Sequence, residues 1–453
     1  MRPRLPSRCG PEWKGKLTWG QRAFLNGMER YSQHARYLNI VRAVDLPPLC
    51  SGKSVTEAVT TILAKYDSLR TTYSLAGEEP LQVVTGGCEA NIRFVEVTED
   101  IASATRDLSN EMRRIPLGAD GGLPCSTIVL TLDGRSARAL LAFSHTVVDA
   151  SSAQIIVGEI TRLLMSGSVD NGAGTQPRER AFLESGERFW AQNERSVNTW
   201  IKRLSDVSGP FRSPRPQERE PQNGCAQAVV RVPLAADRLR RLEEKYQLAS
   251  SAVLVSLTAL TLAAVTDLRR IPLQVLSSNR YATDSEGYVG LLAQVGPLIV
   301  DTGVSGLALR SFVDRVGKQL WGSYKAALWS PDDLDAALQD KGLTFADLAG
   351  WPTYNDVRGV APSFEGPHRP VPEGVVEWMK GWPYQDGRFS IAVTSSSHTL
   401  CLAVRADTAY VSPELILRFL RLFSKNLEAV TSAQEMLQAD AIRLLEDGQY
   451  RDF

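Results

Sequence analysis

The sequence lacks net charge and lacks a long apolar segment. Its 453 residues include 51 Lys plus Arg and 51 Asp plus Glu, so the formal net charge at pH 7 is zero. This balance gives no electrostatic reason to expect a nucleic acid or an anionic membrane as partner. The longest apolar stretch, 252–265, is shorter than the roughly 20 residues of a membrane span and is interrupted by hydroxyl residues. We therefore expect a buried core helix at 252–265, in a soluble protein of the cytoplasm.

Motifs for metal binding, covalent catalysis and phosphate binding are also absent. The six cysteines are scattered without a CxxC pair or a histidine at ligand spacing, which predicts free thiols and no metal. No GxSxG elbow surrounds Ser144, Ser151 or Ser152, which argues against a serine nucleophile. Gly-rich phosphate loops are missing, and the N-terminus has no apolar secretory segment.

Helical and strand patterns alternate along the chain, which is typical of an α/β class. Apolar residues at helical spacing predict a helix over 55–73. Residues 126–132 and 137–145 predict two strands joined by a hairpin turn at Asp-Gly-Arg-Ser. A further helix is expected directly after Asp149.

Two turn-rich segments divide the sequence. The first lies at 166–177 and the second, rich in proline, at 208–224. They predict a first lobe over 1–176 and a second over 177–453, with 177–225 as a crossover. A cleft between two such lobes is a favoured place for a ligand site.

His145 is the strongest candidate for proton transfer. The sequence has four histidines, and His145 ends an apolar strand just before a helix, where a scaffold can hold a base. Asp149 follows at the helix entrance, where a carboxylate can cap the helix and accept a cationic partner. An H-x3-D pair alone more often marks a structural His–Asp turn than a catalytic pair. His34, His368 and His398 have no carboxylate at such spacing and are expected to be ordinary surface or packing residues.

The segment SHTVVDA at 144–150 resembles the HHxxxDG core motif of the condensation-domain superfamily, which includes nonribosomal peptide condensation domains and chloramphenicol acetyltransferase. Further segments resemble other motifs of this superfamily in the expected order: LTWGQ at 17–21, YDSLRTTY at 66–73, ERFW at 187–190, YVGLL at 288–292 followed by PLIV at 297–300, and WPTYN at 351–355. The resemblance spans nearly the whole chain, although the element HQDxPFE is not recognisable after Leu328. It implies two chloramphenicol-acetyltransferase-like lobes in a V-shaped pseudo-dimer, with an active-site tunnel between them.

The resemblance also implies residue roles. His145 matches the histidine that deprotonates or orients the nucleophile, and Arg70 matches the arginine that pairs with the motif aspartate, here Asp149. Arg280 matches the "GR" position, where it could be a structural ion-pair donor or a tunnel residue. On the acceptor side, Tyr354 and Asn355 are the candidates, although the aromatic residues of this region are more often loop anchors than pocket residues.

Two residues depart from the core motif. Ser144 replaces its first histidine, and Ala150 replaces its final glycine. The serine is expected to be tolerated. The extra methyl group of the alanine could narrow the tunnel or reflect a different acceptor.

The resemblance implies acyl transfer without a metal and without a covalent intermediate. The chain shows neither an adenylation domain nor a carrier segment, so we expect a free-standing enzyme of natural-product biosynthesis, of the nonribosomal peptide or enediyne type. Its donor would be a thioester on the phosphopantetheine arm of a separate carrier protein, or alternatively coenzyme A. Its acceptor would be an alcohol or an amine, giving an ester or an amide. Ser144 and Ala150 also motivate a hypothesis of another class, a non-catalytic recruitment module.

Overall fold

The computed structural model describes residues 12–30, 39–87, 89–98, 100–118, 122–168, 174–211, 224–281, 285–303, 306–360, 375–382, 387–396 and 398–432. The chain forms two compact units, each containing helices and sheets. The first unit comprises Met1–Trp190 and Ser278–Ala293, and the second comprises Ala191–Ser277 and Gln294–Phe453. The first unit thus extends beyond the predicted boundary at 176 and takes in a segment from much later in the sequence. His34 and His368 lie outside the described residues.

A four-stranded sheet forms the centre of the first unit. Its strands, in spatial order, are β2 (Asn39–Asp45), β7 (Arg135–Ser144), β6 (Cys125–Leu132) and β5 (Ile92–Glu96). β6 and β7 are the predicted hairpin, and their antiparallel pairing closes across Asp133 and Gly134, which have φ values of 51° and 72°. Two consecutive positive φ angles are what a tight hairpin turn requires, and an Asp-Gly pair adopts them readily.

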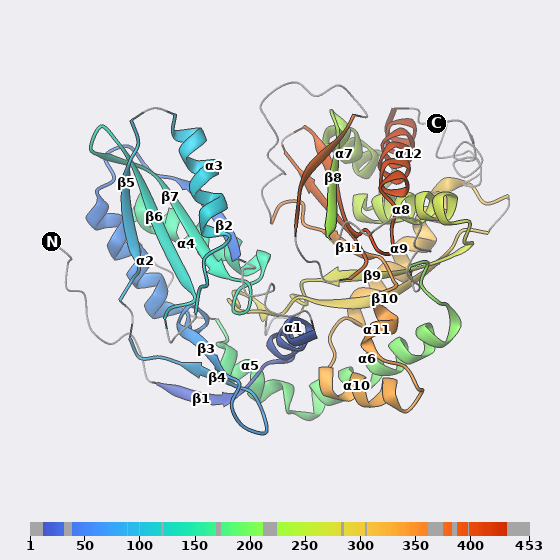
Figure 1. The fold of residues 1–453 in the computed structure, drawn as a ribbon, viewed down its shortest axis with the longest axis horizontal. Helices are drawn as coiled ribbons and strands as arrows, with labels where there is room; N and C mark the ends of the chain where they lie inside the picture. Colours follow the sequence, from blue (N-terminus) through green and yellow to red (C-terminus); the bar gives the residue numbers. More distant parts are fainter. Residues whose placement is uncertain are drawn as a thin grey trace. The chain divides into compact units, whose positions relative to one another are not determined.

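Helices cover both faces of this sheet (Figure 1). α2 (Gly52–Lys65) and α4 (Ala150–Ser166) lie on one face, and α3 (Ile101–Met112) lies on the other. The buried side chains Val55, Val59 and Ile62 follow the helical spacing from which α2 was predicted. Because helices cover both faces of the sheet, the second half of β7 is buried. Its residues 139–143 are all apolar and lead directly to Ser144.

A smaller sheet in the first unit has the order β1-β4-β3. Its strands are β1 (Trp13–Lys16), β4 (Leu81–Val84) and β3 (Thr71–Ser74), and the 3-10 turn η2 (Asp67–Arg70) precedes β3. α1 (Trp19–Arg30) and α5 (Pro177–Glu184) belong to the same unit, and α6 (Glu187–Asp206) continues the chain into the second. The LTWGQ segment has a physical role at the start of α1. The backbone N–H of Thr18 donates to Gln21 Oε1 at 2.9 Å and that of Gln21 donates to Thr18 Oγ1 at 3.2 Å, a reciprocal helix cap.

The second unit contains a seven-stranded sheet of order β10-β9-β11-β13-β14-β8-β12. The strands are β8 (Cys225–Val232), β9 (Arg270–Ser277), β10 (Gln294–Asp301), β11 (Thr353–Asp356), β12 (Val376–Trp382), β13 (Phe389–Ser395) and β14 (Leu400–Asp407). The helices are α7 (Ala235–Tyr246), α8 (Ser250–Thr266), α9 (Leu309–Lys325), α10 (Pro331–Gln339), α11 (Phe345–Leu348) and α12 (Pro413–Ser432). β9 and β10 pair directly, and the 16-residue stretch between them is the part assigned to the first unit.

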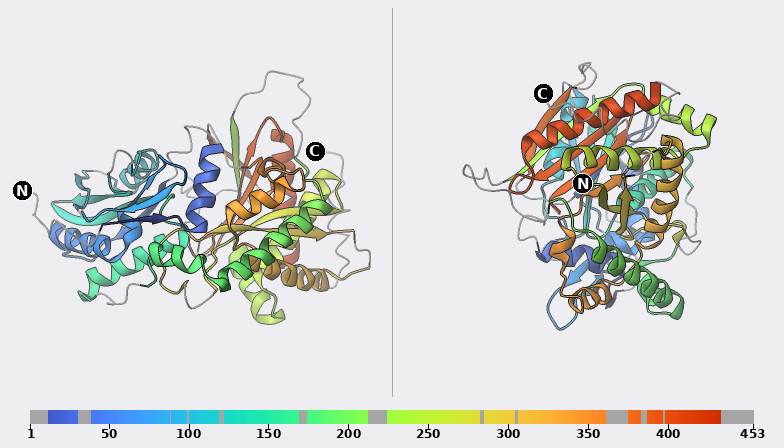
Figure 2. Two further views of the ribbon diagram at one scale, coloured as in Figure 1. Left: turned by 90° about the horizontal axis from the view of Figure 1, so that it is seen from below. Right: turned by 90° about the vertical axis from the view of Figure 1, so that its right-hand side faces the viewer.

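α8 is the core helix predicted at 252–265. Its residues are buried from Ser250 to Val265 except Ser251, and it packs beside α12 (Figure 2). No single helix in the described ranges is both long and apolar enough to cross a membrane, although α7 and α8, bent by 113° at their junction, pass that test together.

Candidate active site in the first unit

His145 occupies the turn that joins β7 to α4. β7 ends at Ser144 and α4 begins at Ala150, with Asp149 as its N-cap. Between them, Val147 and Val148 are 1% and 0% exposed, so their side chains anchor the turn in the core. His145 itself is half-buried.

One hydrogen bond fixes the protonation pattern of the His145 ring. Nδ1 lies 3.0 Å from the carbonyl oxygen of Val148. Because a carbonyl oxygen can only accept, Nδ1 must carry the proton in this contact. The lone pair of the neutral ring is therefore on Nε2, which is the arrangement a general base requires.

The surroundings of His145 favour its neutral form. Burial lowers the pKa of His145, with a small further contribution from the charge of Arg42, and outweighs the opposing effect of the Asp149 carboxylate. Phe24 of α1 contributes to this burial, since its ring centroid lies 5.0 Å from that of the imidazole. At neutral pH the ring is thus available to accept a proton.

Asp149 is held by Arg280. The guanidinium NH1 and NH2 groups lie 2.8 and 2.9 Å from Oδ2 and Oδ1 of the carboxylate, a bidentate contact. The backbone N–H groups of Ser152 and Leu292 donate to the same carboxylate at 2.9 and 3.1 Å. Burial alone would raise the pKa of Asp149, but Arg280 and these donors hold it below its usual range. Asp149 therefore remains ionised and serves as an anchor for the turn.

The predicted pairing of Arg70 with Asp149 is wrong. Arg70 is 1% exposed, and its NH2 group bonds to Asp67 Oδ1 at 2.6 Å while its Nε donates to the Leu63 carbonyl at 3.0 Å. The physical reason is proximity: Asp67 lies in the same 3-10 turn, three residues earlier. Arg70 thus ties the end of α2 to η2. Of the two roles that the sequence allowed for Arg280, ion-pair donor or tunnel residue, the structure shows the first, because Arg280 binds Asp149.

The segment 278–293 is fastened to α4 by a second contact beside the ion pair. Ser152 Oγ accepts from the Gly290 N–H at 2.9 Å and lies 2.8 Å from the Gly290 carbonyl. Arg280 NH2 also donates to Ser152 Oγ at 2.7 Å. On α1, Gly20 lies so close to the Leu291 carbonyl that no side chain could fit there. The sequence prediction did not include Ser152, Gly20 or Phe24 as site residues.

The two departures from the core motif flank the His145 turn. Ser144 is buried, and its Oγ lies 2.8 Å from Oγ1 of Thr146, so a hydroxyl pair bridges the residues on either side of the histidine. Ala150 is the first residue of α4 and is half-buried.

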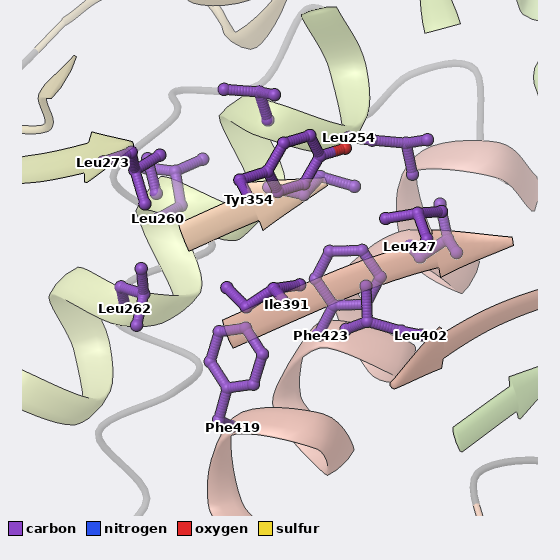
Figure 3. Close-up of a cluster of buried hydrophobic side chains, with 14 of the residues drawn as sticks. Leu254, Leu260, Leu262, Leu273, Tyr354, Ile391, Leu402, Phe419, Phe423 and Leu427 are labelled. Carbon is purple, nitrogen blue, oxygen red and sulfur yellow. The ribbon is translucent and has the colours of Figure 1, made fainter. Parts of the chain in front are cut away.

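Tyr354 is a core residue of the second unit, which corrects its prediction as an acceptor-side candidate. Its ring is 1% exposed and lies among Leu254, Ile391 and Phe423 (Figure 3). Alternation along β11 places it on the face that packs against helices, whereas Asn355 is half-buried. Within the described residues the Tyr354 hydroxyl has no hydrogen-bond partner. His398 of the same unit is an exposed residue, bonded to Asp237 at 2.7 Å.

A condensation-domain family model matches residues 21–328, a range that holds both the His145 turn and Arg280. The chain belongs to the condensation-domain family. Condensation domains of nonribosomal peptide and polyketide synthetases form amide or ester bonds by acyl transfer, and this chain has their mixed α/β fold.

Similar proteins agree with this assignment. Beauvericin nonribosomal cyclodepsipeptide synthetase of Beauveria bassiana is 27% identical over 126 residues, which cover 28% of this chain and 4% of that protein. The condensation domain that mediates chain release from the enacyloxin polyketide synthase has a TM-score of 0.73 at 17% identity, covering 96% of this chain and 84% of that one. SgcC5 of Streptomyces globisporus has a TM-score of 0.69 at 18% identity, and the match covers 92% of this chain and 99% of SgcC5. The chain spans only a small part of the length of the curated relatives.

Proposed function

We propose that the protein is a free-standing condensation enzyme that transfers an acyl or aminoacyl group from a phosphopantetheine thioester to an alcohol or amine, with His145 as general base. The contact between His145 Nδ1 and the Val148 carbonyl is the main support, because it leaves the lone pair of the neutral ring on Nε2. Burial, which lowers the pKa of His145 and keeps the ring neutral, adds to this support.

The reaction we propose needs a single proton relay. Nε2 of His145 accepts the proton of the nucleophile while its oxygen or nitrogen attacks the thioester carbonyl carbon. The tetrahedral intermediate then collapses, the carbon–sulfur bond breaks, and the departing sulfur takes the proton back from Nε2. Base assistance of this kind contributes roughly 10²–10⁴-fold to the rate, and the positioning of the two substrates supplies the rest.

The similar proteins support an alcohol acceptor, whereas condensation domains as a family take their acyl group from a carrier protein or from coenzyme A. The beauvericin synthetase is a cyclodepsipeptide synthetase, and a depsipeptide contains ester bonds. The enacyloxin domain mediates chain release, and SgcC5 was solved with a naphthyl-ethanediol, which is an alcohol. On this basis we place an ester ahead of an amide as the product, in the biosynthesis of a nonribosomal peptide or enediyne-type antibiotic.

Intact-mass spectrometry of candidate carriers tests the donor. Carrier proteins loaded with acyl groups are incubated with diols and amines, with and without the enzyme, and the same acyl groups are offered as coenzyme A esters. We expect enzyme-dependent loss of the acyl mass from a carrier and appearance of an ester. Turnover of the coenzyme A esters alone would replace the carrier with coenzyme A as the donor. If neither donor reacted and the protein only bound carriers, the non-catalytic recruitment module would replace the enzyme.

A further inference from the structure

Tyr73 stands on a rigid part of the first unit. It lies in β3, directly after the turn in which buried Arg70 is bonded to Asp67 and to the Leu63 carbonyl. Its neighbour across the antiparallel pair is Gln82, which is fully buried and donates to the Lys16 carbonyl at 2.8 Å. The backbone that carries the Tyr73 ring is therefore fixed from both sides.

The Tyr73 hydroxyl contacts the turn that presents His145. Its oxygen lies 2.6 Å from the carbonyl oxygen of Thr146, and the phenol must be the donor because the carbonyl can only accept. Burial raises the pKa of Tyr73, so the hydroxyl keeps its proton throughout the neutral pH range.

Thr146 is consequently held by contacts of two kinds, those to Ser144 within the turn and the one to Tyr73. Its side-chain hydroxyl pairs with Ser144 at 2.8 Å, and its carbonyl accepts from Tyr73. The first contact lies within the turn and moves with it, whereas the second connects the turn to a different sheet. The N–H of the same Thr146–Val147 peptide donates to the Ser144 carbonyl at 3.2 Å, again within the turn. Tyr73 is thus the contact that ties this peptide to β3.

We propose that Tyr73 is a positioning residue, which holds the Thr146 peptide so that the His145 ring meets the Val148 carbonyl and presents Nε2 to the substrates. This inference rests on the proposed role of His145 as base. Without the Tyr73 hydroxyl the Thr146 carbonyl loses its tie to β3, the Nδ1 contact of His145 loosens, and both ring tautomers become populated.

Tyr73→Phe tests the proposal because it removes one oxygen atom and keeps the ring. We expect kcat to fall by about 10- to 100-fold with KM unchanged, since misplaced catalytic groups cost rate rather than binding. The ring ¹⁵N shifts of His145 should move from a pure Nδ1–H tautomer towards a mixture. The sequence has four histidines, and His145→Ala identifies the signal.

Tyr246→Phe, on α7 of the second unit, is the matched control and should change neither kcat nor the His145 signals. A wild-type kcat in Tyr73→Phe would overturn the proposal, as would a lower kcat with unmoved His145 signals. The nitrogen shifts do not depend on turnover. If His145→Ala kept the wild-type rate, the proposed function would fail, while the shifts would still decide whether Tyr73 orients the ring.

Discussion

The guanidinium group of Arg280 donates to both carboxylate oxygens of Asp149, at N–O distances of 2.8 and 2.9 Å, although the two residues lie 131 positions apart in the sequence. The contact fastens the segment 278–293 to the N-terminus of α4, directly behind the His145 turn. The side chains are only 13% and 3% exposed, so water cannot replace either partner easily. The ion pair is therefore a structural element of the turn that carries His145.

Removing Arg280 should destabilise the protein strongly. In Arg280→Ala the Asp149 carboxylate stays buried without its cation, and the loss of a partner from a buried pair costs about 3–5 kcal/mol. Arg280→Lys should recover part of this because it restores the charge without the bidentate geometry. Denaturant titration measures the free energy of unfolding. Arg93→Ala, which breaks a pair whose side chains are both 51% exposed, is the control and should cost less than about 1 kcal/mol. Equal losses in both variants would contradict the structural role of Arg280.

The acid limb of the pH–rate profile should lie below the ordinary imidazole value of 6.5. Burial lowers the pKa of His145, and the base is its neutral form, so kcat/KM should rise with pH and level off earlier than for an exposed histidine. An alcohol acceptor keeps the nucleophile from titrating in this range. Initial rates between pH 4.5 and 8 provide the test. A midpoint at or above pH 6.5 would mean that burial does not lower the pKa of His145.

Replacing Gly20 should be costly for a steric reason. A Cβ atom at this position would collide with the Leu291 carbonyl, so Gly20→Ala must push α1 away from the segment 278–293, at about 1–3 kcal/mol. Gly27 lies on the same helix with nothing near its Cβ position. Gly27→Ala should accordingly be neutral or stabilise by up to about 1 kcal/mol. Thermal unfolding of the two variants compares them directly, and a Gly20→Ala protein as stable as the wild type would exclude close packing there.

Tyr354→Phe distinguishes a core residue from an acceptor-site residue. The hydroxyl is buried without a partner in the described residues, so its removal should leave stability unchanged or raise it by about 1 kcal/mol. KM for the acceptor should stay at the wild-type value. A large increase in that KM would restore Tyr354 to the acceptor site.

Local patterns allowed correct predictions where the cause was local. The β6–β7 hairpin followed from its Asp-Gly turn, α8 from its apolar run, and the cap at Asp149 from its place before a helix. Which carboxylate each arginine binds was less predictable, because ion pairing depends on how segments distant in the sequence pack together. Nothing near Arg280 indicates that its loop leaves the β9–β10 hairpin to join α4, and nothing near Arg70 ranks Asp67 above Asp149. Tyr354 was misplaced because a four-residue strand is too short for alternation to show which face is buried.

The rate of acyl transfer by His145→Ala tests the central claim most directly. The enzyme is mixed in excess with a loaded donor and a diol, and ester formation is followed in a single turnover, with circular dichroism to verify the fold. A folded variant that is slower by roughly 10²–10⁴-fold would match the loss of a general base at Nε2. A folded variant that forms ester at the wild-type rate would contradict it.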